Sequence, residues 1–239
     1  MIQGQNRQEI IDVLYEDNHV IVVNKKASDI VQGDKTGDVT LPDKIKEYLK
    51  IKYDKPGNVF CGVVHRLDRP TSGVVLFAKT SKALSRLNEQ FRSKDTQKTY
   101  WAVVENTPKS PSARLENFLW KNEKQNKSYV HLNDEKGAKK AILSYKTILK
   151  SDNYTLLEVE LETGRHHQIR VQLSQIGSII KGDVKYGAKR SNPDGSIHLH
   201  ARKLSFIHPT TKELIIVVAQ VPNDTLWNWF QFEVSKKSK

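Results

Sequence analysis

The sequence is poor in cysteine and has no long apolar run near its start. Cys61 is the only cysteine among 239 residues, so an intrachain disulfide cannot form and a cysteine-based zinc site cannot be built. Between Met1 and Lys26, no uninterrupted apolar segment is longer than Val20–Val23, and neither a secretory signal nor a membrane span is predicted there. We therefore expect a cytoplasmic protein that does not associate with membranes.

Acidic residues are scarce relative to basic ones. Lysine and arginine number 39 against 27 aspartates and glutamates, which gives a formal net charge of +12 at pH 7. The field of such a chain attracts polyanions, and nucleic acid is the first partner to consider on this ground. A basic surface without such a partner is the alternative that charge alone leaves open.

The pattern of apolar residues predicts more strand than helix. Strands are expected in segments 10–17, 20–26, 73–79, 98–106, 141–149, 154–163, 196–209 and 212–222, and helices in 41–50, 81–93 and the segment that ends at Gly177. Segment 107–140 is polar and is predicted to form a hairpin or excursion outside the core. This order lacks the regular alternation of a parallel sheet and predicts an α+β fold with a mixed, largely antiparallel sheet and flanking helices. One domain is expected over 1–239, with a disordered tail at 235–239.

A single carboxylate lies among cations in "HRLDRPTSGVVLFAKT", residues 65–80. Arg66 and Arg69 would keep Asp68 ionised, and thus available as a nucleophile or a base. Turn-forming residues and an apolar strand follow, which places Asp68 on a loop anchored by rigid structure. A surface aspartate in an ion-pair network is the alternative.

A second polar cluster is "GRHHQIR", residues 164–170. Gly164 ends an acidic strand, and Arg165, two histidines, Gln168 and Arg170 follow at the start of a predicted helix. Backbone N–H groups and cationic side chains at a helix N-terminus favour an anion. That anion could be a phosphate or Asp68, and a solvated first turn is the alternative.

Three histidines and a polar loop in the last third of the sequence are further candidate sites. His198 and His200 share one side of a predicted strand, with His208 nearby, so a common ligand set is geometrically feasible. No acid or cysteine completes the set nearby in the sequence, and we expect no metal. Lys185 and Tyr186 lie in a polar loop where a phosphate contact is expected.

Five segments together resemble the RluA-type family of RNA pseudouridine synthases. They are "HRLDRPTSGVVLFAKT", "KTYWAVV", "GRHHQIRVQLSQIG", "KGDVKYG" and "LHARKLSFIHP", and the resemblance extends from about Ile11 to Pro222. It implies a pseudouridine synthase fold with a central active-site cleft and isomerisation of specific uridines in ribosomal or transfer RNA. The resemblance implies no cofactor, and we expect a monomer.

The resemblance also implies roles for individual residues. Asp68 corresponds to the catalytic aspartate, Tyr100 to the tyrosine that stacks on uracil, and Arg165 to the basic residue that pairs with the aspartate. Arg66 corresponds to the arginine that fills the gap left by the flipped uridine, and Leu199 to the apolar wall beside the base. The other side chains predicted to contact the substrate are those of His65, Arg69, Gln168, Arg170, Lys185 and Tyr186.

The sequence departs from the family pattern after the first predicted hairpin. The family has a Lys-Pro dipeptide followed by Ala-Gly, whereas this chain has "NKKASDI", so the shape of that loop is expected to differ. Many relatives carry a small N-terminal RNA-binding module, and we expect none here because the resemblance starts by Ile11.

The chemical step and two other functions stay open at this level. Asp68 could attack C1′, add to C6 or remove the 2′ proton. An N-glycoside hydrolase with Asp68 as nucleophile would need a second carboxylate, for which Glu162 is the nearest candidate. A non-catalytic RNA-binding protein is the other alternative.

Overall fold

One mixed sheet organises the chain. The computed structural model describes residues 11–33, 37–131, 133–134 and 137–237. Its strands are β1 (Val13–Glu16), β2 (Val20–Lys25), β3 (Gly62–Val63), β4 (Ser72–Ala78), β5 (Gln97–Val104), β6 (Ser112–Asn122), β7 (Lys127–His131), β8 (Lys139–Lys150), β9 (Thr155–Leu161), β10 (Leu199–Ile207) and β11 (Leu214–Val218). Its helices are α1 (Leu41–Lys52), α2 (Ser81–Ser93), α3 (Gln168–Gln175), the short 3₁₀ helix η2 (Val184–Tyr186) and α4 (Thr225–Lys237).

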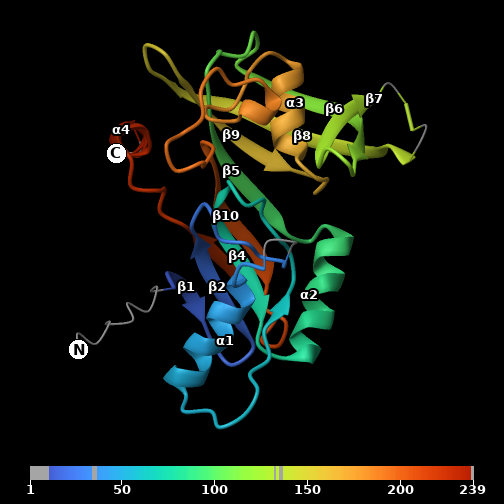
Figure 1. Cartoon of the computed structure of the whole chain (residues 1–239), viewed down its shortest axis with the longest axis vertical. Helices are drawn as coiled ribbons and strands as arrows, with labels where there is room; N and C mark the ends of the chain where they lie inside the picture. The colour runs from blue at the N-terminus through green and yellow to red at the C-terminus, as the bar shows by residue number, and fades with distance from the viewer. Residues whose placement is uncertain (1–10, 34–36, 132, 135–136, 238–239) are drawn as a thin grey trace.

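The strands lie in the order β1-β2-β4-β10-β5-β9-β8-β6-β7, with β11 paired to β10 and β3 to β4. Among the described strands, β4 and β10 are the parallel pair, and the others pair antiparallel. Figure 1 shows β5 and β10 running between a lower half, with β1, β2, β4, α1 and α2, and an upper half, with β6 to β9 and α3. The predicted α+β fold class is confirmed.

The two faces of the sheet carry separate apolar clusters. Strand β4 is buried along its whole length because its side chains alternate between them: Val75 and Phe77 face one cluster, Val74 and Leu76 the other. Helices α1 and α3 pack on the first face and α2 on the second. A strand covered on both faces reads as a continuous apolar run, which is why the sequence located β4 well.

The parallel pair β4–β10 brings two functional segments together, and Gly73 permits it. Gly73 pairs with Ala201 and has a φ of +117°, and an added Cβ would lie 2.3 Å from the Ala201 carbonyl oxygen. Such a close backbone approach requires glycine. The loop that precedes β4 is thereby held beside the start of β10.

Helix starts follow sequence signals, with one shift. The Thr40 hydroxyl accepts a hydrogen bond from the Asp43 N–H at 3.3 Å, and Pro42 lies in the first turn of α1. In α2 the capping side chain is Thr80, which accepts from the Ala83 N–H at 3.1 Å and lies one residue before Ser81, where the helix was expected to start. The two residues are adjacent cap formers, and only Thr80 has the extended backbone that a cap needs.

Two predictions about the chain outside the core were wrong. The polar segment forms the expected hairpin, β6 and β7, but β6 also pairs with β8 from Ser112↔Lys146 to Leu119↔Lys139 and so extends the sheet. Helix α4 includes residues 235–237 of the expected disordered tail, while 238–239 lie outside the described residues. The continuous sheet supports the single domain, which stays a prediction.

A buried carboxylate joins β1 to α1 and β4. Glu16 accepts hydrogen bonds from Tyr48 at 3.1 Å, Lys52 at 2.7 Å, Tyr53 at 2.7 Å and Lys79 at 2.8 Å. Burial opposes ionisation, but the hydrogen bonds from Lys52, Lys79 and Tyr53 outweigh it and lower the pKa of Glu16 to about 2. Glu16 is therefore ionised and stabilising in the native state.

We expect Glu16→Gln to lower the melting temperature by about 6–12 °C at neutral pH. The native pKa of about 2 lies below the ordinary value of 4.5, a shift equivalent to about 3 kcal/mol, and a domain of this size loses about 2–4 °C per kcal/mol. The stabilisation is fully present above the unfolded-state pKa and is lost as pH falls toward the native one. Thermal denaturation should therefore show a difference between the parent and the variant that is about half as large at pH 3 as at pH 7, and an equal difference at both pH values would contradict this account.

Candidate active site

One pocket collects most of the residues that the sequence singled out. It is lined by the loop residues Arg66, Leu67, Asp68 and Thr71, by Tyr100 of β5, Leu161 of β9 and Leu199 of β10, and by the segment from Gly164 to Arg170. These come from distant parts of the chain, which β4, β5, β9 and β10 bring together as sheet neighbours. The pocket is the predicted cleft.

A buried lysine holds the loop that carries Asp68. The Lys25 ammonium is 1% exposed and donates hydrogen bonds to the carbonyl oxygens of Thr71 at 2.8 Å, Lys26 at 2.9 Å and Arg69 at 3.2 Å. Burial lowers the pKa of Lys25 to about 8, so the group is still mostly protonated at neutral pH. The first lysine of "NKKASDI" thus fixes the backbone just after Asp68, although the family's proline is absent.

Asp68 pairs with a buried arginine. Its side chain is 30% exposed, and its Oδ2 lies 3.3 Å from Arg170 Nη1. Arg170 also forms a bidentate pair with Asp183, with Nε–Oδ2 at 2.7 Å and Nη2–Oδ1 at 2.8 Å. Both partners of this second pair are buried. One guanidinium therefore bridges two carboxylates.

The ion-pair partner predicted from the sequence, Arg165, is wrong. Arg165 lines the pocket, but its Nε donates to the Lys140 carbonyl oxygen at 2.9 Å. Helix α3 begins only at Gln168, after His167 with a φ of 54°. Arg165 therefore stays in the turn beside β8, while Arg170 projects from the first turn of the helix.

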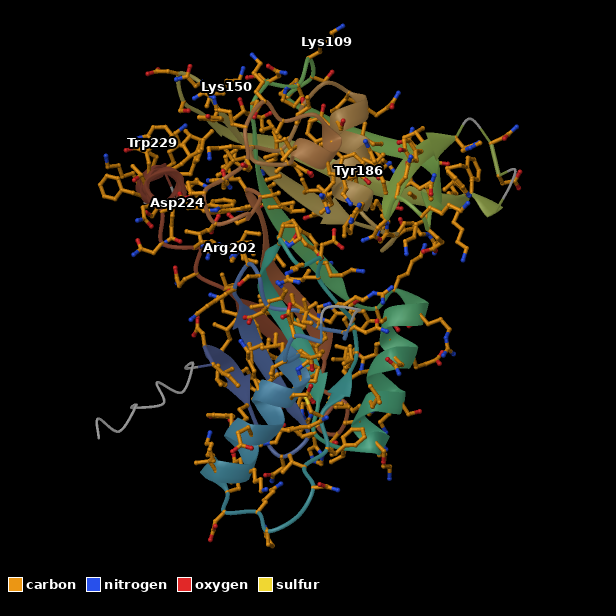
Figure 2. The ribbon with its side chains drawn as sticks, in the orientation of Figure 1. Lys109, Lys150, Tyr186, Arg202, Asp224 and Trp229 are labelled. Carbon is orange, nitrogen blue, oxygen red and sulfur yellow. The ribbon has the colours of Figure 1, made fainter. Side chains whose placement is uncertain are left out.

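His166 and His167 complete this side of the pocket. Their rings stack with centroids 3.7 Å apart, and His167 Nε2 lies 3.5 Å from Asp68 Oδ2. Burial, followed by the charge of Arg170, lowers the pKa of His167 to about 2, so its ring is neutral. His167 Nδ1 lies 2.9 Å from the hydroxyl of Tyr186, which is next to α3 in Figure 2.

Tyr100 and Leu199 form the apolar wall opposite. Both are buried, at 7% and 4% exposure, and both line the pocket. The Tyr100 hydroxyl makes no hydrogen bond with any other residue that the structure describes. Burial, followed by the charge of Asp68, raises the pKa of Tyr100. The phenol is therefore neutral and available to a bound molecule.

Comparison with known proteins identifies the fold and its chemistry. A family model described as RNA pseudouridylate synthase matches residues 19–175. The chain belongs to this family. Its members are isomerases that convert uridine in RNA to pseudouridine, so the predicted family and enzyme class are confirmed.

Individual relatives agree with the family match. An uncharacterized RNA pseudouridine synthase of Synechocystis is 33% identical over 216 residues, covering 89% of this chain and 66% of the relative. The ribosomal large subunit pseudouridine synthase D of Zymomonas mobilis is 32% identical over 224 residues, covering 90% and 70%. The chain thus spans about two thirds of the length of these relatives. The solved structure of human RNA pseudouridylate synthase domain containing 4 has the same fold, with a TM-score of 0.76, 22% identity and 93% coverage of each chain.

Two residues predicted to contact the substrate, His65 and Gln168, have partners within the protein. His65 Nε2 accepts from the Leu76 N–H at 3.0 Å, and its ring stacks on Phe91. Gln168 lines the pocket, but its amide bonds to Thr163, to the Arg165 N–H and to the Ile142 carbonyl oxygen. A direct base contact by either side chain gains no support from these positions.

Three other predicted contacts lie outside the pocket lining. Tyr186 is buried, and its hydroxyl accepts from the Ser128 N–H at 2.9 Å. Arg69 is half-exposed and pairs with Asp38 at 2.9 Å. Lys185 donates to the Asn126 carbonyl oxygen at 3.1 Å. Phosphate contacts by Arg69 and Lys185 stay predictions, while Arg66 lines the pocket and hydrogen-bonds Gln32.

Sequence reasoning assigned no role to His167 or Asp183. In the sequence His167 is one of the two histidines of "GRHHQIR", without a role of its own. Asp183 in "KGDVKYG" is a lone acid between lysines, which is the same signal that singled out Asp68. Only their contacts in the fold show that both belong to the site.

The histidines considered as metal ligands bind separate partners. His198 Nε2 lies 3.1 Å from Asp224, His200 Nδ1 lies 2.9 Å from the Ser72 hydroxyl, and His208 Nε2 lies 2.7 Å from Asp17. Two of these histidines contact an aspartate that is distant in the sequence, but each contacts a different aspartate. In the part of the chain that the structure covers, no group of three or more His, Cys, Asp or Glu residues could hold a metal ion.

Proposed function

We propose that this chain isomerises specific uridines of large-subunit ribosomal RNA, with Asp68 as the catalytic carboxylate. Relatives named ribosomal large subunit pseudouridine synthase D and C, from Zymomonas mobilis and Vibrio vulnificus, are 32% and 34% identical to it. In the reaction the N1–C1′ bond breaks, the uracil turns, and C5 bonds to C1′. The proton on C5 is lost and N1 gains one, so no other reactant is required.

The observation that carries the proposal is the composition of the pocket. Asp68 is the only carboxylate among the described residues that line it, and Arg170 pairs with it at 3.3 Å. Attack at C1′, addition to C6 and removal of the 2′ proton all require an ionised carboxylate. The choice among these three first steps stays open.

The other lining residues suit a flipped base. The enzyme must take the uridine out of its stack, which costs a few kcal/mol and least in unpaired RNA. Tyr100 offers its ring for stacking, and Leu199 covers the apolar side. Arg66 is exposed and would occupy the space that the base leaves, and Arg165, also exposed, would contact the RNA backbone.

The hydrolase alternative gains no support from the geometry. A glycosidase uses two carboxyl groups about 5–9.5 Å apart across the scissile bond. Glu162 is exposed and forms hydrogen bonds with Arg114 at 2.9 and 3.2 Å, and it is not among the pocket residues. Release of free uracil from RNA would favour the alternative.

The uridines that this enzyme modifies in the cell can be found by mapping pseudouridine across total RNA. We expect a deletion strain to lose pseudouridine at one or a few positions of large-subunit ribosomal RNA, and the parent gene to restore them. Asp68→Asn should not restore them, whereas the exposed-acid control Glu162→Gln should. Losses confined to transfer RNA would contradict the proposed substrate. Restoration by Asp68→Asn would favour a non-catalytic RNA-binding protein.

None of the helices described by the structure has both the length and the apolar character to cross a membrane. A cytoplasmic location and a monomeric state stay predictions.

A further inference from the structure

The two oxygens of Asp68 have different surroundings. Oδ2 lies 3.3 Å from Arg170 Nη1 and 3.5 Å from His167 Nε2. Oδ1 has no hydrogen bond or ion pair with any other residue within the described ranges. A carboxylate held by one oxygen keeps a fixed orientation and leaves the other oxygen for reaction.

One short segment, residues 183–186, contacts both of the side chains that approach Oδ2. Asp183 binds Arg170 through Nε and Nη2 at 2.7 and 2.8 Å. The Nη1 group is left to contact Asp68. Tyr186, three residues later, places its hydroxyl 2.9 Å from His167 Nδ1. Asp183 and Tyr186 are 1% and 6% exposed, so neither contact competes with water.

Tyr186 and Asp68 together favour one tautomer of His167. The Tyr186 hydroxyl accepts the Ser128 N–H at 2.9 Å, and its own proton points either to His167 Nδ1 at 2.9 Å or to the Ser128 carbonyl oxygen at 3.2 Å. If Nδ1 carried the proton, the lone pair of Nε2 would face the negative Oδ2. The arrangement in which Tyr186 donates to Nδ1 and Nε2–H faces Asp68 avoids this repulsion.

We propose that Asp183 and Tyr186 are positioning residues for the isomerisation. They act through Arg170, which pairs with Asp68 Oδ2 at 3.3 Å, and through His167, whose Nε2 lies 3.5 Å from the same oxygen, so that Oδ1 is left as the reacting oxygen. Asp183 also occupies two of the N–H groups of Arg170, so the guanidinium contacts Asp68 through Nη1 without enclosing its carboxylate. This inference rests on the proposed function of Asp68.

The first test measures single-turnover tritium release from a large-subunit ribosomal RNA transcript labelled at C5 of uridine. We expect Asp183→Asn to lower the rate by about 10²-fold, the scale of an ångström-sized misplacement, with RNA affinity within about three-fold of the parent. Asp183→Glu restores the charge and should recover part of the rate. An unchanged rate in Asp183→Asn, or a loss of affinity that equals the loss of rate, would overturn the role of Asp183.

A matched control separates positioning from loss of stability. Glu16→Gln also removes a buried carboxylate with several donors, but far along the sheet from the pocket, and it should lower the melting temperature without lowering the rate. If both variants are destabilised and both keep the parent's rate, Asp183 is only structural and the proposal fails.

The second test uses Tyr186→Phe, which removes one hydroxyl and keeps the packed ring. We expect the rate to fall by about 10-fold or more, as for other groups that orient a functional histidine. The ¹⁵N shifts of the His167 ring should show the Nε2–H form in the parent and a loss of that preference in the variant. An unchanged rate together with an unchanged tautomer would overturn the role of Tyr186. This test does not depend on Asp183→Asn, and it remains valid if that variant does not fold. A parent enzyme that releases no tritium would refute the proposed function, while the tautomer measurement would still test the contact.

Discussion

Asp68→Asn is expected to abolish isomerisation, with a loss of at least about 10⁴-fold, because the amide cannot serve as nucleophile or base. The substitution preserves the size of the side chain, and Arg170 keeps its bidentate pair with Asp183 at 2.7 and 2.8 Å. The fold and the RNA-binding surface should therefore be retained. We expect RNA affinity within about three-fold of the parent.

The measurement is tritium release by the purified variant under single-turnover conditions, paired with a direct binding titration. Glu162→Gln is the matched control, because it neutralises an exposed carboxylate that pairs with Arg114 outside the pocket. Turnover by Asp68→Asn within about ten-fold of the parent would remove Asp68 from the chemical step.

Tyr100→Phe should slow the reaction by about 10² to 10⁴-fold if the phenol takes part in proton transfer at C5. The ring that stacks on uracil stays in place, so binding should survive. Because the hydroxyl of Tyr100 has no partner among the described residues, its removal should leave the free energy of unfolding almost unchanged. The structure thus makes this substitution a clean test of the hydroxyl.

Tyr145→Phe provides the comparison. Tyr145 is buried on β8 outside the pocket, and its hydroxyl donates to the Ser110 carbonyl oxygen at 3.2 Å. Its loss should cost about 1 kcal/mol of stability and leave the rate unchanged. An unchanged rate in Tyr100→Phe would show that the hydroxyl is dispensable, and equal losses of rate and affinity would make Tyr100 a binding residue.

Helix α4 shows where local sequence signals stop being informative. Its segment mixes aromatic and polar residues without a clear apolar stripe, and no helix was predicted there. Trp227 and Phe230 are buried against Trp101, Val103 and Leu156 of β5 and β9. Trp229, on the same helix, is 39% exposed and lies at the outside of the molecule in Figure 2. Packing on the sheet therefore accounts for this helix better than its own periodicity does.

The sequence by itself determined the fold class, most of the strands, the family and the loop that carries Asp68. These follow from local physics: alternation and apolar runs mark strands, cap residues mark helix starts, and a carboxylate between arginines in a turn marks a charged loop. The motifs, whose order matches the family, also predicted that Tyr100 and Leu199 line the pocket.

Only the tertiary structure decided which cation pairs with Asp68 and what holds that cation. Arg165 and Arg170 lie five positions apart in one motif, and their charges are equivalent in the sequence. The left-handed backbone of His167 and the start of α3 send one toward β8 and the other toward Asp68. Asp183 meets Arg170 because the chain returns beside α3 after thirteen further residues. Such contacts depend on where chain segments cross, which local patterns of charge and hydrophobicity do not encode.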